Sequence, residues 1–220
     1  MRLMSFIMAT AACVSGSMAT AGTTLSAVDG ICTDPVASYD QRTAALADAG
    51  FVQPVSDALL TDALTSDATL LGSLIGMMQP GPELDAMIAQ AGGAVASLKA
   101  NPDVSVWRLP DDSAILYTML ERSPTTAALR LTCKYVGTTA AGSRSDMMAT
   151  SRYADIMHNE AVTPAVYTAD PAALQAAQPK TGWTDMAIML IDDSARSDAA
   201  QRQLPVRFPV TYTSQSILLP

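Results

Sequence analysis

The chain has 220 residues, of which 49% are hydrophobic and 5% aromatic, and its formal net charge is −8 at pH 7. Nucleic acids and anionic membrane surfaces are bound by clustered Lys and Arg side chains, so this acidic balance argues against both as partners. A chain of this length can bury a substantial core as a single domain, although two small domains would also fit.

The N-terminus predicts an export signal that occupies residues 1–21. Arg2 gives a short positive start, and an uncharged apolar run follows it. Ala19 and Ala21 then stand in the A-x-A arrangement that signal peptidases recognise. We therefore expect a mature chain that begins at Gly22 and is periplasmic or secreted.

Two other interpretations of this N-terminus are less favoured. A Ser-Gly-Ser tripeptide at 15–17 interrupts the apolar run before it reaches the roughly 20 residues of a membrane-spanning helix, so no membrane anchor is expected after cleavage. A lipoprotein signal around Cys13 would need leucine where Thr10 stands. Because cleavage removes Arg2 but no acidic residue, residues 22–220 carry 21 acidic and 12 basic side chains, a net charge of −9.

The cysteine count predicts one disulfide bond. Cys13 leaves with the signal, and Cys32 and Cys133 remain. Thiols in exported proteins tend to be oxidised, so we expect these two to be linked. In the chain-entropy model a loop of about 100 residues makes such a bond worth about 4 to 5 kcal/mol. A redox-active pair is less favoured, because C-x-x-C spacing is missing.

The first predicted helix covers residues 33–49. Thr33 or Asp34 can accept the free amide hydrogens at its start, Pro35 suits its first turn, and Gly50 supplies a stop. The first cysteine of the mature chain would then lie just before a helix.

Two further helical regions are expected before residue 100. Residues 56–78 carry apolar side chains at helical spacings and predict two short helices divided near Thr65–Ser66. The helix over 82–99 has the most regular pattern, with one apolar face made of Leu84, Met87, Ile88, Ala91, Val95 and Leu98. Gly92 and Gly93 weaken its middle by about 1 kcal/mol each, which indicates that another backbone segment approaches closely there.

From residue 103 onwards the pattern is that of strands. Residues 103–109 and 114–121 predict a hairpin around the turn sequence PDDS. Residues 127–136 alternate so that Cys133 lies on the buried face, against which the helix after Cys32 would dock.

Two later strands complete the predicted sheet. They cover 184–192 and 206–214, and Pro209 favours an edge position for the second because proline cannot donate to the ladder. The sequence therefore predicts an α+β fold, in which N-terminal helices pack on one face of an antiparallel β-sheet of about five strands. Residues 22–220 would form one domain, with a helical part at 33–99 and a strand-rich part at 103–217.

The loop-rich stretch 137–182 is the predicted contact region. It holds the only histidine, His158, and could contain a short helix over 146–158. Long connections without regular structure inside compact domains are often functional. Since aromatic and arginine side chains carry much of the energy at interfaces, the predicted binding residues are Arg152, Tyr153, His158 and Trp183.

No catalytic residue, metal site or cofactor is predicted. A single histidine without H-E-x-x-H spacing does not suit a zinc hydrolase. There is no G-x-S-x-G, and KTG at 180–182 lacks the S-x-x-K box that accompanies it in penicillin-binding enzymes. A copper(I) carrier that uses Met147, Met148 and Met157 with His158 is one alternative.

The function predicted from these observations is that of an exported periplasmic binding or accessory protein. Its partner would be an envelope protein or a small ligand, and not a nucleic acid. An enzyme whose site no motif reveals, and the Met/His copper(I) carrier, are the alternatives.

Overall fold

The computed structural model describes residues 22–34, 37–72, 78–138, 154–157, 165–168, 188–191, 204 and 206–218. For the short segments between 154 and 191 it describes the backbone only. Within these ranges the helices come first in the chain, as α1 (Gly22–Thr33), α2 (Tyr39–Asp48), α3 (Asp57–Leu70), α4 (Pro82–Gly93) and α5 (Val95–Ala100).

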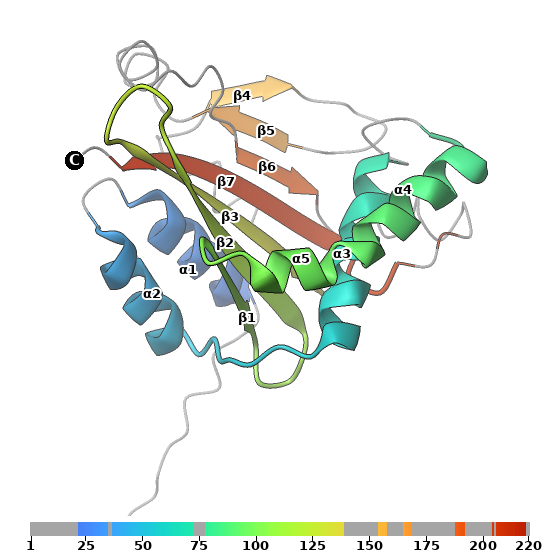
Figure 1. Ribbon diagram of the computed structural model, residues 1–220, viewed down its shortest axis with the longest axis horizontal. Coiled ribbons are helices and arrows are strands. Elements are labelled where there is room, and N and C mark those ends of the chain that lie inside the picture. The colour runs from blue at the N-terminus through green and yellow to red at the C-terminus, as the bar shows by residue number, and fades with distance from the viewer. Residues whose placement is uncertain are drawn as a thin grey trace, which may run out of the picture.

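The strands follow the helices and form one antiparallel sheet. They are β1 (Val104–Arg108), β2 (Ala114–Arg122), β3 (Leu129–Gly137), β4 (Ala154–Met157), β5 (Ala165–Thr168), β6 (Ile188–Ile191) and β7 (Val210–Leu218). Their order is β1-β2-β3-β7-β6-β5-β4 (Figure 1). The α+β class is confirmed. The strand count differs from about five, since four strands (β1, β2, β3, β7) form the layer on which the helices pack and three four-residue strands extend it.

Helices cover both faces of this four-stranded layer. One core cluster joins α1 and α2 to the face of Leu116, Cys133 and Tyr212. A second joins α3 and α5 to the face of Ile115 and Val136. Figure 1 shows α1 and α2 at one side of the strands, α3 and α4 at the other, and α5 drawn across the strands.

The expectation that all the helices lie on one face is therefore wrong for α3, α4 and α5. The sequence carried a signal for this arrangement. Residues 114–117 are apolar at successive positions, which is typical of a strand covered on both faces. Alternation in β3 alone identifies the face of Cys133 but not the elements that cover the opposite face.

The predicted disulfide between Cys32 and Cys133 is present. Its Cα atoms lie 6.2 Å apart, and each cysteine is 1% exposed. Two further contacts hold α1 on the same face: the Tyr212 hydroxyl donates to Asp29 Oδ1 at 2.5 Å, and the Ser216 hydroxyl donates to the Cys32 carbonyl at 3.0 Å. The helix that docks on Cys133 is thus α1, which contains Cys32 in its last turn rather than following it.

The first predicted helix begins later than expected. The chain is helical up to Thr33 in α1, and the next helix starts at Tyr39. Ser38 is its N-cap: its hydroxyl accepts from the Gln41 amide at 3.3 Å, and its own amide donates to Gln41 Oε1 at 2.8 Å. This reciprocal capping box satisfies two amides at once. Thr33 instead closes α1, where its hydroxyl donates to the Asp29 carbonyl at 2.7 Å.

Replacement of Ser38 by Ala tests this helix start. We expect the free energy of unfolding to fall by about 1 kcal/mol, because the capping hydroxyl is lost. Urea denaturation measures the change. Ser26→Ala is the matched control, since Ser26 is exposed inside α1 and should cost nothing. Equal losses in both variants would contradict the capping role.

A buried arginine of α2 binds the carbonyl groups at the end of α1 and in the segment that joins the two helices. Arg42 is 3% exposed, and its guanidinium donates to the carbonyls of Ile31 and Ala37 at 3.1 Å, and to those of Cys32 and Asp34. Burial lowers its pKa, and the Asp34 carboxylate opposes that shift. A cation at this place satisfies the carbonyls that a helix C-terminus leaves without partners and complements its dipole.

The other helical predictions are confirmed in outline and corrected in their boundaries. α3 runs without a break through Thr65 and Ser66, whereas the single helix expected over 82–99 is divided at Ala94. Its predicted apolar face is buried or half-buried. α3 does approach Gly92, but through threonine methyl groups rather than backbone, since a Cβ there would lie 3.3 Å from Thr65 Cγ2.

The strand predictions also needed correction at two places. The β1–β2 hairpin is confirmed. Pro209, however, precedes β7, which is an interior strand between β3 and β6 and not an edge. Residues 154–157 form a strand, not part of a helix, and β5 also lies inside the stretch 137–182. Among the described helices, none is long and apolar enough to cross a membrane.

Because the phenol of Tyr135 is buried, we expect the protein to lose stability at alkaline pH. Burial, with a smaller effect of the Asp111 charge, raises the pKa of Tyr135 to about 12. The folded state thus favours the neutral phenol. This preference stabilises the fold fully below pH 10, and the free energy of unfolding falls by about 2 to 3 kcal/mol as the pH rises from 10 towards 12. Urea denaturation between pH 8 and pH 11 would show this slope. Tyr135→Phe should reduce the slope, and an unchanged slope would contradict the assignment.

Candidate functional site

The residues predicted to bind lie outside the described part of the chain. Arg152, Tyr153, His158 and Trp183 all belong to segments whose structure is not described. Their role as contact residues therefore stays a prediction. For Met157, in β4, only the backbone is described, so the proposed methionine–histidine copper site is not tested either.

Among the described residues, no group of three or more His, Cys, Asp or Glu side chains could hold a metal ion. Two polar networks remain to be considered, one at the β1–β2 turn and one between α3 and the sheet.

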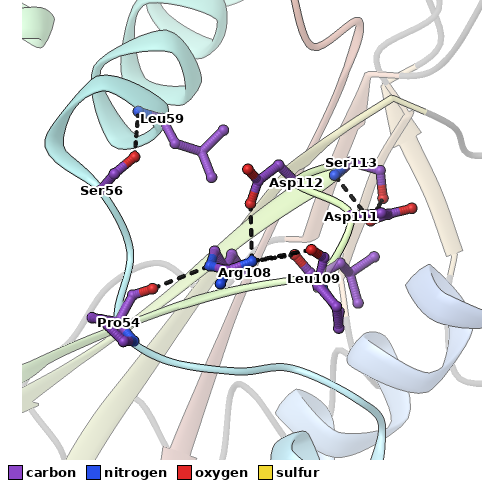
Figure 2. Close-up of polar contacts among 9 residues, drawn as sticks. Pro54, Ser56, Leu59, Arg108, Leu109, Asp111, Asp112 and Ser113 are labelled. Carbon is purple, nitrogen blue, oxygen red and sulfur yellow. Dashed lines mark hydrogen bonds and ion pairs between the residues drawn. The ribbon is translucent and has the colours of Figure 1, made fainter.

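The network at the β1–β2 turn surrounds Arg108 (Figure 2). Its Nε donates to the Pro54 carbonyl at 3.1 Å, and its Nη1 lies 3.1 Å from Asp112 Oδ1. Beside it, the Ser113 hydroxyl donates to Asp111 at 2.6 Å and holds the pKa of that carboxyl below its usual value. These contacts join the hairpin to the segment that leads into α3. We assign this network a structural role.

The second network joins α3 to the sheet through Asp67. Lys134 Nζ lies 2.5 Å from Asp67 Oδ2, and the Thr211 hydroxyl donates to Asp67 Oδ1 at 2.6 Å. The side chains of Lys134 and Asp67 are 13% and 9% exposed. Buried charges need a partner and hydrogen bonds to offset their desolvation, and each carboxylate oxygen has one here.

Further polar side chains surround this ion pair on the same sheet face. Tyr117, Lys134 and Thr213 are direct cross-strand neighbours on β2, β3 and β7. Thr132 lies two residues before Lys134 and therefore shares its face. Burial, with the nearby Asp67 charge, raises the pKa of Tyr117, which stays a neutral phenol. We call Asp67, Tyr117, Thr132, Lys134 and Thr213 the α3-face cluster.

Two hydroxyl groups of the α3-face cluster are buried without partners. Thr132 Oγ1 and Thr213 Oγ1 have no hydrogen bond within the described part of the chain, and Thr132 is 7% exposed. Leaving such a group unsatisfied costs about 1 to 3 kcal/mol. Valine has the same shape and suits a strand at least as well. Stability alone thus does not account for these two threonines.

The sequence analysis assigned no role to the α3-face cluster. Alternation in β3 puts Thr132 and Lys134 on the face opposite Cys133, for which no covering element was predicted. One signal was present in the sequence: Val136, on the same face of the strand, is apolar, and in the structure it is fully buried. The partner on α3 could not be found, because Asp67 and Thr211 are 144 residues apart in the sequence.

The α3-face cluster is rich in hydrogen-bond donors. The Lys134 ammonium has three N–H groups, of which Asp67 accepts one, and the hydroxyls of Tyr117, Thr132 and Thr213 can each donate. The only carboxylate, Asp67, already accepts a bond at both oxygens. Such a set can hold acceptor oxygens of a ligand.

Comparison with known proteins gave no match. No family model, no curated protein and no solved structure is significantly similar to this chain.

Proposed function

We propose that this protein is an exported binding protein of the cell envelope, and that its ligand contacts the α3-face cluster. The observation that carries this proposal is a pair of buried hydroxyls beside the ammonium of Lys134, on Thr132 and Thr213, which have no hydrogen-bond partner among the described residues. Binding groups that stability does not require are expected at functional sites.

Export is supported by the disulfide. Disulfides persist mainly in oxidising compartments such as the periplasm and the extracellular space. α1 lies after the predicted cleavage point, and its side chains at Leu25, Val28 and Cys32 are buried in the core. A mature chain from Gly22 would therefore keep these core residues.

Export is tested by producing the full chain in a bacterium that has a periplasm. The periplasmic fraction should contain a protein whose intact mass corresponds to residues 22–220, and non-reducing peptide mapping should find Cys32 linked to Cys133. Retention of residues 1–21 in the cell, or free thiols at both positions, would contradict the proposal.

Binding is tested by a thermal-shift screen of the mature protein with envelope extracts, peptides and metal ions. A ligand that binds only the folded state raises the melting temperature by mass action. Thr132→Val and Thr213→Val are the informative variants: the shift should be lost in them, while Ser26→Ala on α1 should keep it. A ligand that stabilises all variants equally would place the binding site elsewhere.

No contact among the described residues favours an enzyme or a copper carrier, so we propose no second function.

A further inference from the structure

We infer that the α3-face cluster binds the carboxylate group of a small organic monoacid. This inference rests on the proposed binding function and specifies the chemistry of its ligand. It follows from the kind of hydrogen-bonding groups in the cluster, their charge and the apolar side chain beside them.

The first argument is the arrangement of donors across three strands. Tyr117, Lys134 and Thr213 form one row, because the register pairs Tyr117 with Lys134 and Lys134 with Thr213. Thr132 lies in the neighbouring row, opposite Gln215 on β7. Cβ atoms of direct cross-strand neighbours lie about 5 Å apart and those of diagonal neighbours, such as Thr132 and Thr213, about 7 to 8 Å, so groups from both rows can reach the two oxygens of one small ligand group. A carboxylate offers two acceptor oxygens and matches such a set.

The second argument is charge. The ammonium of Lys134 and the carboxylate of Asp67 balance each other, so the cluster itself is neutral. A ligand with one negative charge gains charge-assisted hydrogen bonds from Lys134. Asp67 and the rest of an acidic chain, whose net charge is −8, repel any anion, and this repulsion grows with the charge of the ligand. The cluster therefore suits a monocarboxylate better than a phosphate.

The third argument is the apolar neighbour of Thr132. The register places Met119 of β2 directly opposite Thr132, on the same face, and Met119 is half-buried. Methionine side chains adapt their shape to apolar groups. An alkyl or aromatic substituent of the acid would thus have a contact beside the hydroxyls that bind its carboxylate.

The test is isothermal titration of the mature, disulfide-bonded protein with matched probes. Propionate and benzoate are compared with propionamide and benzamide, which have similar shapes but no charge, and with inorganic phosphate. We expect the acids to bind at least about tenfold more tightly than the amides and phosphate, because bonds to a charged acceptor are the stronger ones.

Two variants and one control link the binding to the cluster. Thr132→Val and Thr213→Val should each weaken binding of the acids by at least about tenfold, with an unchanged or higher melting temperature, because an unsatisfied hydroxyl is removed. Ser26→Ala should bind like the unchanged protein. A lower melting temperature in both valine variants would show that the hydroxyls serve folding, and would overturn the inference.

The remaining outcomes separate this inference from the proposed function. Equal binding of acids and amides, or tighter binding of phosphate, would overturn the monocarboxylate and leave the binding function standing. Acid binding that both valine variants retain would place that site elsewhere and also overturn the inference. If no probe binds, but an envelope extract stabilises the unchanged protein and not Thr132→Val, the proposed ligand class is wrong and the binding function stands. If neither probes nor extracts act, both proposals fail.

Discussion

Replacement of both Cys32 and Cys133 by Ala should lower the free energy of unfolding by about 4 to 5 kcal/mol. The disulfide closes a loop with a sequence separation of 101 residues, and without it the unfolded chain regains that loop entropy. This loss is a large fraction of the about 5 to 15 kcal/mol that is typical of the total stability of a protein. Urea denaturation of the oxidised protein and of the double variant measures the difference.

Ser214→Ala is the matched control for this disulfide prediction. Ser214 lies directly opposite Cys133 on β7 and is 1% exposed, and its hydroxyl has no partner in the described part of the chain. Its removal should cost little, although it disturbs the same part of the core. A double cysteine variant as stable as Ser214→Ala would show that the loop constraint contributes nothing.

Replacement of Lys134 by Met should lower the free energy of unfolding by about 3 to 5 kcal/mol. The variant keeps the length of the side chain but leaves the buried charge of Asp67 with one hydrogen bond, from Thr211. An uncompensated buried charge is the costly outcome, and replacement of both partners is much milder. The double variant Lys134→Met with Asp67→Leu should therefore be more stable than Lys134→Met alone.

Lys99→Met is the control for this ion pair. Lys99 Nζ also lies 2.5 Å from a carboxylate, on Asp57, but the two side chains are 38% and 77% exposed. An exposed pair contributes about 0 to 1 kcal/mol, so the control should lose little. Equal losses in Lys99→Met and Lys134→Met, or a double variant less stable than either single one, would contradict the role given to burial.

Local pattern and residue counting were sufficient for several features of this fold. Only two cysteines remain once a signal is removed, and that count predicted the disulfide. Alternation with period two placed Cys133 on a buried face, and a turn sequence between two apolar runs predicted the β1–β2 hairpin. The helical period identified the face of Leu84 and Val95. All of these signals act between residues close in sequence or between the only two candidates available.

The start of α2 shows where local reasoning fails. The local sequence predicted a start at Thr33 or Asp34 with Pro35, whereas Ser38 with Gln41 caps the helix in the structure. The packing of α1 against Cys133 decided otherwise, because it keeps the chain helical up to Thr33 and brings its last carbonyls to Arg42. The start of α2 is therefore decided by the three-dimensional arrangement and not by the first cap signal in the sequence.

The sequence by itself determined the α+β class, the disulfide and the buried face of β3. Tertiary structure alone decided that α3 covers the opposite face, that β7 is interior, and that Asp67 meets Lys134. Periodicity states which residues of one element share a face, but it contains no information about the element that will cover that face. That choice depends on packing between segments far apart in the chain, here between α3 and two strands that follow it much later.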